Sequence, residues 1–197
     1  DRHNRVRNGT ARYAEWDYGP QKWMMNLLTI NHKADNALYD EATLRLAQQS
    51  FAESRIDRSL NSEIRSKRFE DVEAYSLNLD FVKLTGKRNT VFYGFEYILN
   101  DVNSTGMDEN IVTGVSVPGP SRYPQAEWTS LAAYLNDEYS VSEKVTLQAG
   151  LRYNHYLLNA EFDNTFYPFP FSSAKINNGA LTGSFGGVYR PTDRLVI

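Results

Sequence analysis

The sequence predicts an all-β protein, in the form of an antiparallel up-and-down β-barrel that spans a membrane. The first observation is alternation: from Val145 to Asn154, apolar residues take every second position and polar or small residues take the others. A period of two gives a strand two unlike faces. The second observation is length, because this run is about twice as long as an ordinary strand of roughly 5–6 residues. The third is that the connections between predicted strands are alternately short and long.

The early part of the chain gives conflicting signals. Residues 21–31 are compatible with a strand or with a helix. In residues 41–53, apolar side chains recur at helical spacing and the composition favours a helix. Local propensity therefore predicts a helix at 41–53, with a strand as the alternative.

A β-hairpin is predicted between residues 72 and 100. Apolar residues take the odd positions from Tyr75 to Phe81, and the same parity continues from Val91 to Leu99 after a turn at 83–89. Matched parity across a short polar turn predicts that both apolar sets share one face of the sheet. Further strands are predicted at residues 129–140, 144–158 and 180–190.

The connections are of two kinds. Short turns with charged or turn-forming residues are predicted near 82–89, 140–144 and 190–194. Long loops are predicted near 101–127 and 159–179. If neighbouring strands are antiparallel, all short turns lie at one end of the sheet and all long loops at the other. This is the layout of an outer-membrane barrel, with short periplasmic turns and longer outer loops.

The apolar parity is expected to face lipid, and the polar parity to face the lumen. About 9–11 residues of tilted strand cross the hydrocarbon layer, and several predicted strands have that length. Aromatic residues also gather near both predicted rims, as interfacial rings do. They are Phe81, Tyr93, Tyr139 and Tyr189 toward the short turns, and Tyr75, Tyr97 and Tyr153 toward the long loops. A water-soluble barrel or sandwich is the alternative, because its strands also alternate.

Composition excludes several classes of protein. No run of about 18 apolar residues occurs, so no helix is expected to cross a membrane. The net charge of −3 gives no sign of nucleic-acid binding, and the absence of cysteine rules out disulfides and thiolate metal sites. Residues 1–5 form a charged start that does not resemble a signal peptide. The three histidines lack metal-ligand spacing and no nucleophile or phosphate motif occurs, so we expect no enzyme, metal site or cofactor.

The best candidates for ligand binding lie in and near the long loops. Aromatic residues are unusually dense in one polar loop and could be joined by two from the loop before it: Phe166, Tyr167, Phe169 and Phe171, with Tyr123 and Trp128. Exposed aromatic clusters mark binding surfaces. Arg55 and Arg58, with Arg65 and Arg68 nearby, could meet an anionic ligand or the phosphates of lipopolysaccharide. The alternatives are that the rings only pack on one another and that the arginines are solvated.

Three stretches resemble the barrel of TonB-dependent outer-membrane receptors: residues 51–81, 130–156 and 186–197. In the second, "AAYLNDEY" is followed by a short turn and "VTLQAGLRY". The resemblance covers roughly residues 40–197 and implies that 41–53 is a strand, against its local propensity. It also implies a barrel of about 22 strands with a plugged lumen. Because about seven or eight strands are predicted here and the last residues fall inside one, we expect residues 1–197 to be a fragment of a single barrel domain.

The resemblance implies a function in uptake across the outer membrane. The ligand would be a scarce one of the iron–siderophore, haem or cobalamin class, and the energy would come from the inner membrane. The expected partners are the lipid bilayer, lipopolysaccharide, a small metal complex, and the TonB energy-coupling protein through a plug domain not in this chain. Two other functions stay open at this point: a small barrel for adhesion or structure, and an outer-membrane hydrolase using His155 and Ser130.

Overall fold

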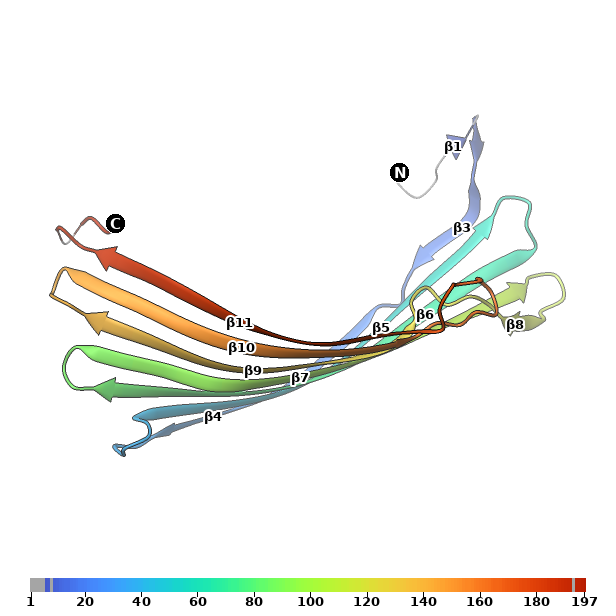
Figure 1. Ribbon diagram of the computed structural model, residues 1–197. Helices are drawn as coiled ribbons and strands as arrows, with labels where there is room; N and C mark the ends of the chain where they lie inside the picture. Colours follow the sequence, from blue (N-terminus) through green and yellow to red (C-terminus); the bar gives the residue numbers. More distant parts are fainter. Residues whose placement is uncertain (1–5, 8, 193) are drawn as a thin grey trace.

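The computed structural model describes residues 6–7, 9–192 and 194–197, which form antiparallel strands (Figure 1). The long strands are β4 (Lys22–Lys33), β5 (Glu41–Ser59), β6 (Ile64–Thr85), β7 (Asn89–Asn110), β9 (Gln125–Ser140), β10 (Val145–Glu161) and β11 (Ser173–Tyr189). The short strands are β1 (Val6–Arg7), β2 (Thr10–Ala11), β3 (Tyr13–Tyr18) and β8 (Ser116–Pro118). The described part of the chain contains no helix that could span a membrane.

The main sheet is one curved layer that does not close on itself (Figure 1). Its order is β11-β10-β9-β7-β6-β5-β3, with β4 also beside β5 and β8 beside β7. Because β4 pairs with residues 41–52 of β5 and β3 with residues 55–59, the two act as one edge strand interrupted near Pro20. Counted in this way, seven long strands lie side by side in the described residues, in agreement with the seven or eight expected. The all-β, antiparallel class is confirmed.

The helix that local propensity predicts at 41–53 is wrong, and the strand implied by the resemblance is correct. These residues lie in β5, which pairs with β4 on one side and β6 on the other. Leu44 and Leu46 lie opposite Leu79 and Leu77 and extend their apolar row. Helix propensity is a weak preference, and strand pairing on both edges outweighs it here.

The predicted hairpin is confirmed. β6 and β7 are joined at residues 86–88, Tyr75 lies opposite Leu99, and Phe81 lies opposite Tyr93. Directly opposed residues of an antiparallel pair share a face. The rings of Phe81 and Tyr93 accordingly stack, with centroids 5.0 Å apart.

The short turn expected at 140–144, between β9 and β10, occupies residues 141–144. The expected turn at 190–194 includes residue 193, which lies outside the described residues. Residues 1–5, the charged start of the sequence, lie outside them as well.

Both long loops are shorter than the sequence indicates. β7 continues to Asn110 and β9 begins at Gln125, so the loop expected at 101–127 is reduced to residues 111–124. β10 continues to Glu161 and β11 begins at Ser173, so the loop expected at 159–179 is reduced to residues 162–172. The loop ends of these strands carry polar residues on both faces, which removes the alternation that marks a strand in the sequence.

The two faces of the sheet differ in character, as the alternation predicts. One, the apolar face, includes Leu135, Leu151, Leu181 and Phe185. The other, the polar face, includes Asp80, Tyr134 and Arg152 in a single row. The buried apolar residues of the described chain are Ala132 and Ala160, whereas Phe185 is 79% exposed. With so small a core, this sheet must cover its apolar face with something other than a second layer of the described chain.

Aromatic rings mark both ends of the apolar face. At the turn end, the ring of Tyr39 lies 5.9 Å from His32 and 5.4 Å from Phe81, measured between centroids. At the loop end lie the rim tyrosines, Tyr75, Tyr97 and Tyr153. The strands continue well past them, since β6 begins at Ile64 and β7 ends at Asn110. The loop end of the sheet therefore stands beyond the apolar band, and it carries the candidate site.

Candidate functional site

The loop between β7 and β9 folds inward across the polar face of the sheet. A Cβ atom at Gly106 would collide with the carbonyl oxygens of Gly119 and Pro120, so this close approach requires glycine. The backbone N–H of Gly119 donates to the carbonyl oxygen of Gly106 over 2.9 Å. The backbone N–H of Tyr123 donates to the hydroxyl oxygen of Ser104, a residue only 1% exposed. These contacts hold the loop against the wall of the sheet.

Arg122 fastens the same loop to β5 and β6. Its guanidinium lies 3.6 Å from the carboxylate of Glu53 and 3.5 Å from that of Glu70. The two glutamates are directly opposed in the register, and like charges in that arrangement repel. Burial raises the pKa of Glu70, which is 5% exposed, whereas a hydrogen bond from Arg55 lowers the pKa of Glu53. Arg122 therefore supplies the positive charge that this pair of carboxylates needs.

Arg122 also lines a hollow of about 250 Å³ on the polar face, the arginine hollow. Its walls include Trp16, Tyr18, Arg55 and Arg68. The Arg55 guanidinium lies 4.5 Å from the centroid of the Tyr18 ring. Asp57 lines the hollow too, and burial raises the pKa of its carboxyl. Three guanidinium groups beside two aromatic rings suit a ligand that combines anionic groups with flat apolar parts.

A second hollow of about 200 Å³, the aromatic hollow, lies between the two long loops. It is lined by Arg122, Tyr123, Phe162, Phe166, Tyr167 and Phe169. The Phe169 ring lies 5.4 Å from Phe162 and 6.1 Å from Tyr167, measured between centroids. The Arg122 guanidinium lies 4.9 Å from the centroid of Tyr123. Arg122 thus stands at the boundary between the arginine hollow and the aromatic hollow.

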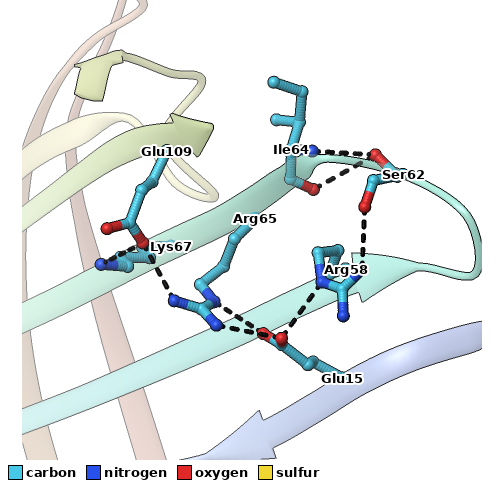
Figure 2. Close-up of polar contacts among 7 residues, drawn as sticks. All are labelled: Glu15, Arg58, Ser62, Ile64, Arg65, Lys67 and Glu109. Atoms are coloured by element: carbon cyan, nitrogen blue, oxygen red, sulfur yellow. Dashed lines mark hydrogen bonds and ion pairs between the residues drawn. The ribbon is translucent and has the colours of Figure 1, made fainter. Parts of the chain in front are cut away.

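A separate ionic network occupies the opposite side of the sheet at the same end (Figure 2). Glu15 accepts from Arg65 at 2.6 and 2.9 Å and from Arg58 at 3.1 Å. Glu109 accepts from Arg65 at 3.1 Å and lies 2.8 Å from the ammonium of Lys67. The hydrogen bond from Arg65 is the main reason that the pKa of Glu15 falls to about 2. We call Glu15, Arg58, Arg65, Lys67 and Glu109 the outer network.

The model of the family described as TonB dependent receptor-like, beta-barrel matches residues 1–197, the whole chain. The chain belongs to the TonB-dependent receptor β-barrel family. No curated protein matches it in sequence.

Three solved structures share the fold of this receptor domain at low identity. The copper transporter OprC has a TM-score of 0.70 and 11% identity, over 93% of this chain and 30% of OprC. The ferric citrate transporter FecA, in its unliganded form, has a TM-score of 0.64 and 14% identity, over 93% of this chain and 27% of FecA. The ferric yersiniabactin uptake receptor FyuA from Yersinia pestis has a TM-score of 0.63 and 15% identity, over 88% of this chain and 27% of FyuA. The chain thus spans less than a third of each of these proteins, which agrees with a fragment of a larger barrel.

The receptor domain brings most of the predicted ligand-binding residues together. Phe166, Tyr167 and Phe169 line the aromatic hollow with Tyr123. Phe171 contacts the same cluster, with its ring centroid 4.9 Å from that of Phe162. Their role in binding stays a prediction.

The other predicted residues are divided between sites. Arg55 lines the arginine hollow. Trp128 lies apart from both hollows and stacks on Tyr156, with centroids 5.4 Å apart. Arg58 belongs to the outer network, on the opposite side of the sheet from Arg55. The sequence could have separated the two arginines, because positions three apart on a strand face opposite ways.

Four lining residues of the hollows were not predicted from the sequence: Arg122, Phe162, Trp16 and Tyr18. Arg122 could have been predicted, because it precedes Tyr123 in a loop that was already predicted to bind ligand. Phe162 lies only four positions before Phe166 and could have been included with it. Trp16 and Tyr18 could not have been predicted as site residues, because only the pairing of β3 with β5 brings them beside Arg55.

Proposed function

We propose that this chain is part of an outer-membrane receptor that takes up a scarce, anionic metal complex. The observation that carries the proposal is Arg122, which borders a hollow with two further arginines and a hollow lined by five aromatic rings. Family membership supports a receptor, and the transporter neighbours favour a role that is not enzymatic. Both hollows lie on the polar face, which is the lumen side in a closed barrel.

The chemistry of the two hollows favours an iron–siderophore complex or haem over cobalamin. Guanidinium groups form strong, often bidentate hydrogen bonds with carboxylates and other oxyanions. The aromatic hollow offers rings that can stack on a flat ligand at little entropic cost. Carboxylates of the sheet hold the arginines in position without a ligand; the Nε of Arg55, for example, lies 3.0 Å from a carboxylate oxygen of Glu53.

The rest of the assembly follows from the same proposal. The apolar face would contact lipid, and the turn end would face the periplasm, with the hollows on the outer side. The outer network lies beyond the rim tyrosines, where it could contact the anionic sugars of lipopolysaccharide through Arg58 and Lys67. Energy would come from the TonB protein, which would act on a plug domain not in this chain.

The first test compares two arginines on opposite sides of β5 in the full-length receptor. Intrinsic fluorescence would follow the binding of ferric citrate, a ferric catecholate, haem and cyanocobalamin. Arg55→Gln should weaken binding of the preferred complex by about tenfold, which is the loss of about one charged hydrogen bond. Arg58→Gln is the matched control and should leave the affinity unchanged. Equal affinities for both variants would contradict the proposed site.

The second test asks whether the loop rings bind ligand or only pack on each other. Phe166, Tyr167, Phe169 and Phe171 would be changed together to Ser in the full-length receptor. Pro168 and Pro170 remain in place and keep the backbone restricted. We expect weaker binding and slower uptake with the barrel still folded. A folded barrel with unchanged affinity and uptake would assign these rings a structural role only.

A further inference from the structure

An acidic residue interrupts the apolar face near its turn end. Asp137 of β9 lies opposite Val91 of β7 and Ala149 of β10, and Ala149 in turn lies opposite Phe185. Tyr139 follows two positions later, at the turn end of the same strand. With a strand rise of about 3.3 Å and a tilt near 45°, Asp137 stands roughly 5 Å deeper in the apolar band than Tyr139.

The carboxylate of Asp137 accepts no hydrogen bond from the described residues. Its Oδ1 is fully covered and has no hydrogen-bond partner in the described part of the chain, so a donor from outside the protein has access only to Oδ2. Lys83 lies in the same cross-strand row, but its ammonium already donates to a carboxylate oxygen of Asp40 and to the carbonyl oxygen of Asn36, each over 2.7 Å. A carboxylate in an apolar layer without a partner is costly, so its partner is expected from the surroundings.

A groove adjoins Asp137 on the apolar face. It is open to the exterior, has a volume of about 520 Å³, and is lined by Leu135, Asp137, Ala149, Gly150, Leu151, Gly183, Ser184 and Phe185. Leu151 and Phe185 form its raised apolar walls and are 56% and 79% exposed. Ala149 and Gly183 leave space between them because their side chains are small or absent. A long apolar chain fits this shape, with a carboxylate at hand for its polar end.

We propose that this groove binds a phospholipid with an ethanolamine headgroup. The primary ammonium would donate a hydrogen bond to Oδ2 of Asp137, and an acyl chain would lie along Leu135, Leu151 and Phe185. Lys144 and Arg190 lie in the exposed connections at the same end and offer positive charge to the lipid phosphate. A phospholipid without an ammonium, such as one with a glycerol headgroup, would meet the carboxylate with no compensating donor. The inference rests on the proposed membrane location and is independent of the cargo.

The preference of the Asp137 carboxylate for a cationic group distinguishes an ethanolamine lipid from the other molecules that could cover the groove. A lysine of another protein, or a second copy of this chain, could also cover an apolar groove with a carboxylate. Only a lipid with a primary ammonium makes the retained lipid depend on both headgroup and Asp137. The described residues include no group of three or more metal-ligating side chains, and one carboxylate is too few for a cation site.

The experiment uses the full-length receptor in nanodiscs of equal parts phosphatidylethanolamine and phosphatidylglycerol with the same acyl chains. Native mass spectrometry would count the lipids kept by the protein after the disc is stripped. We expect the wild type to keep phosphatidylethanolamine at least fivefold over phosphatidylglycerol, and Asp137→Asn to lose this preference. Asp101→Asn, an exposed position of β7 beyond the rim tyrosines, is the matched control and should keep it.

A second variant tests the groove itself. A Cβ atom at Gly183 would stand in ordinary contact with Leu151, at 3.4 Å, so Gly183→Leu should fill the groove without disturbing the strand. We expect it to keep fewer lipids of both kinds. No headgroup preference in the wild type, an unchanged preference in Asp137→Asn, or a polypeptide retained in place of lipid would each overturn the proposal. Lipid preference with no cargo uptake would instead leave this site standing and contradict only the proposed function.

Discussion

Gly94 shows how one residue organises the polar face. It lies opposite Asp80 on one side and Tyr134 on the other, so the three form a row across β6, β7 and β9. The Tyr134 ring lies across the space that a side chain at Gly94 would fill, and its hydroxyl donates to Asp80 over 2.6 Å. The Arg45 guanidinium is the second partner of the Asp80 carboxylate, at a distance of 2.5 Å. The missing side chain therefore permits a polar network inside the wall of the barrel.

We expect Gly94→Ala to destabilise the folded barrel by about 1–3 kcal/mol, because overpacking forces neighbours to move. The new Cβ atom would stand 2.6 Å from the carbonyl oxygen of Leu79 and 2.7 Å from the Tyr134 ring. Gly186→Ala on β11 is the matched control, since a Cβ atom there meets nothing within 4 Å. Urea unfolding followed by the heat-modifiable mobility shift would measure both. Equal stabilities would show that Tyr134 moves aside freely.

Glu15 makes the outer network sensitive to acid. Its pKa falls from 4.5 to about 2 in the folded protein, so its stabilising effect is complete above 4.5 and is lost as the pH falls through about 2. We expect amide-exchange protection of β3 to decline across this window. Glu15→Gln should lower protection at neutral pH and abolish the decline, whereas Glu127→Gln should match the wild type. A decline of the same size in Glu15→Gln would assign the effect to another carboxyl.

At the level of the secondary-structure element, the loop at 111–124 depends on a few anchoring residues. The loop at 111–124 contains three residues of strand, yet it lies against the sheet because Gly106 admits it and Arg122 pairs with Glu53 and Glu70. Removing one partner from a largely buried charge cluster leaves the others uncompensated. The loop should thus behave as a unit that opens when its anchor is lost.

We expect Arg122→Met to lower the free energy of local opening at residues 116–125 by about 2–3 kcal/mol, as hydrogen exchange would measure. Adding Glu70→Gln should restore part of the loss, because the opposed carboxylates are then reduced to one charge. Arg190→Met, at the other end of the sheet, should change nothing in this segment. A double variant no more protected than Arg122→Met would argue against repulsion between Glu53 and Glu70.

At the scale of the whole molecule, the sheet has almost no core of its own and exposes a broad apolar face. Leu151 is 56% exposed on that face, and Gln148 lies on the polar face with its amide donating to Glu138 over 2.9 Å. A lipid-facing arginine near mid-bilayer costs roughly 2–4 kcal/mol, whereas an arginine in the lumen can be solvated. Membrane assembly should therefore distinguish the two positions sharply.

We expect Leu151→Arg to reduce the yield of folded, heat-modifiable barrel in the outer membrane much more than Gln148→Arg. The arginine at position 148 would also face the carboxylate of Glu138 and gain a partner. The comparison would be made in the full-length receptor at matched expression. Similar yields would mean that the assigned lipid and lumen faces are wrong.

Local sequence pattern was enough to predict the strands of the apolar band and the direction in which their side chains face. Alternation is a local property of an extended chain, so Tyr75 and Phe81, or Val145 and Leu151, must share a side wherever the strand lies. A short turn then fixes the pairing of its two strands, which is why the register of β6 with β7 followed from residues 72–100. The resemblance of residues 130–156 to TonB-dependent receptors also predicted the family correctly.

Contacts between distant parts of the chain determined the secondary structure and the site wherever the local sequence pattern was weak or misleading. Residues 41–53 form a strand because β4 and β6 supply backbone partners on both edges, and no local preference encodes those partners. The true ends of β7 and β10 were hidden because polar residues on both faces remove the alternation. The candidate site was predicted in part, through Tyr123, Arg55 and the loop rings. Arg122 became its centre because a loop folds back over Gly106 to bring it beside Glu53 and Glu70, which are distant in the sequence.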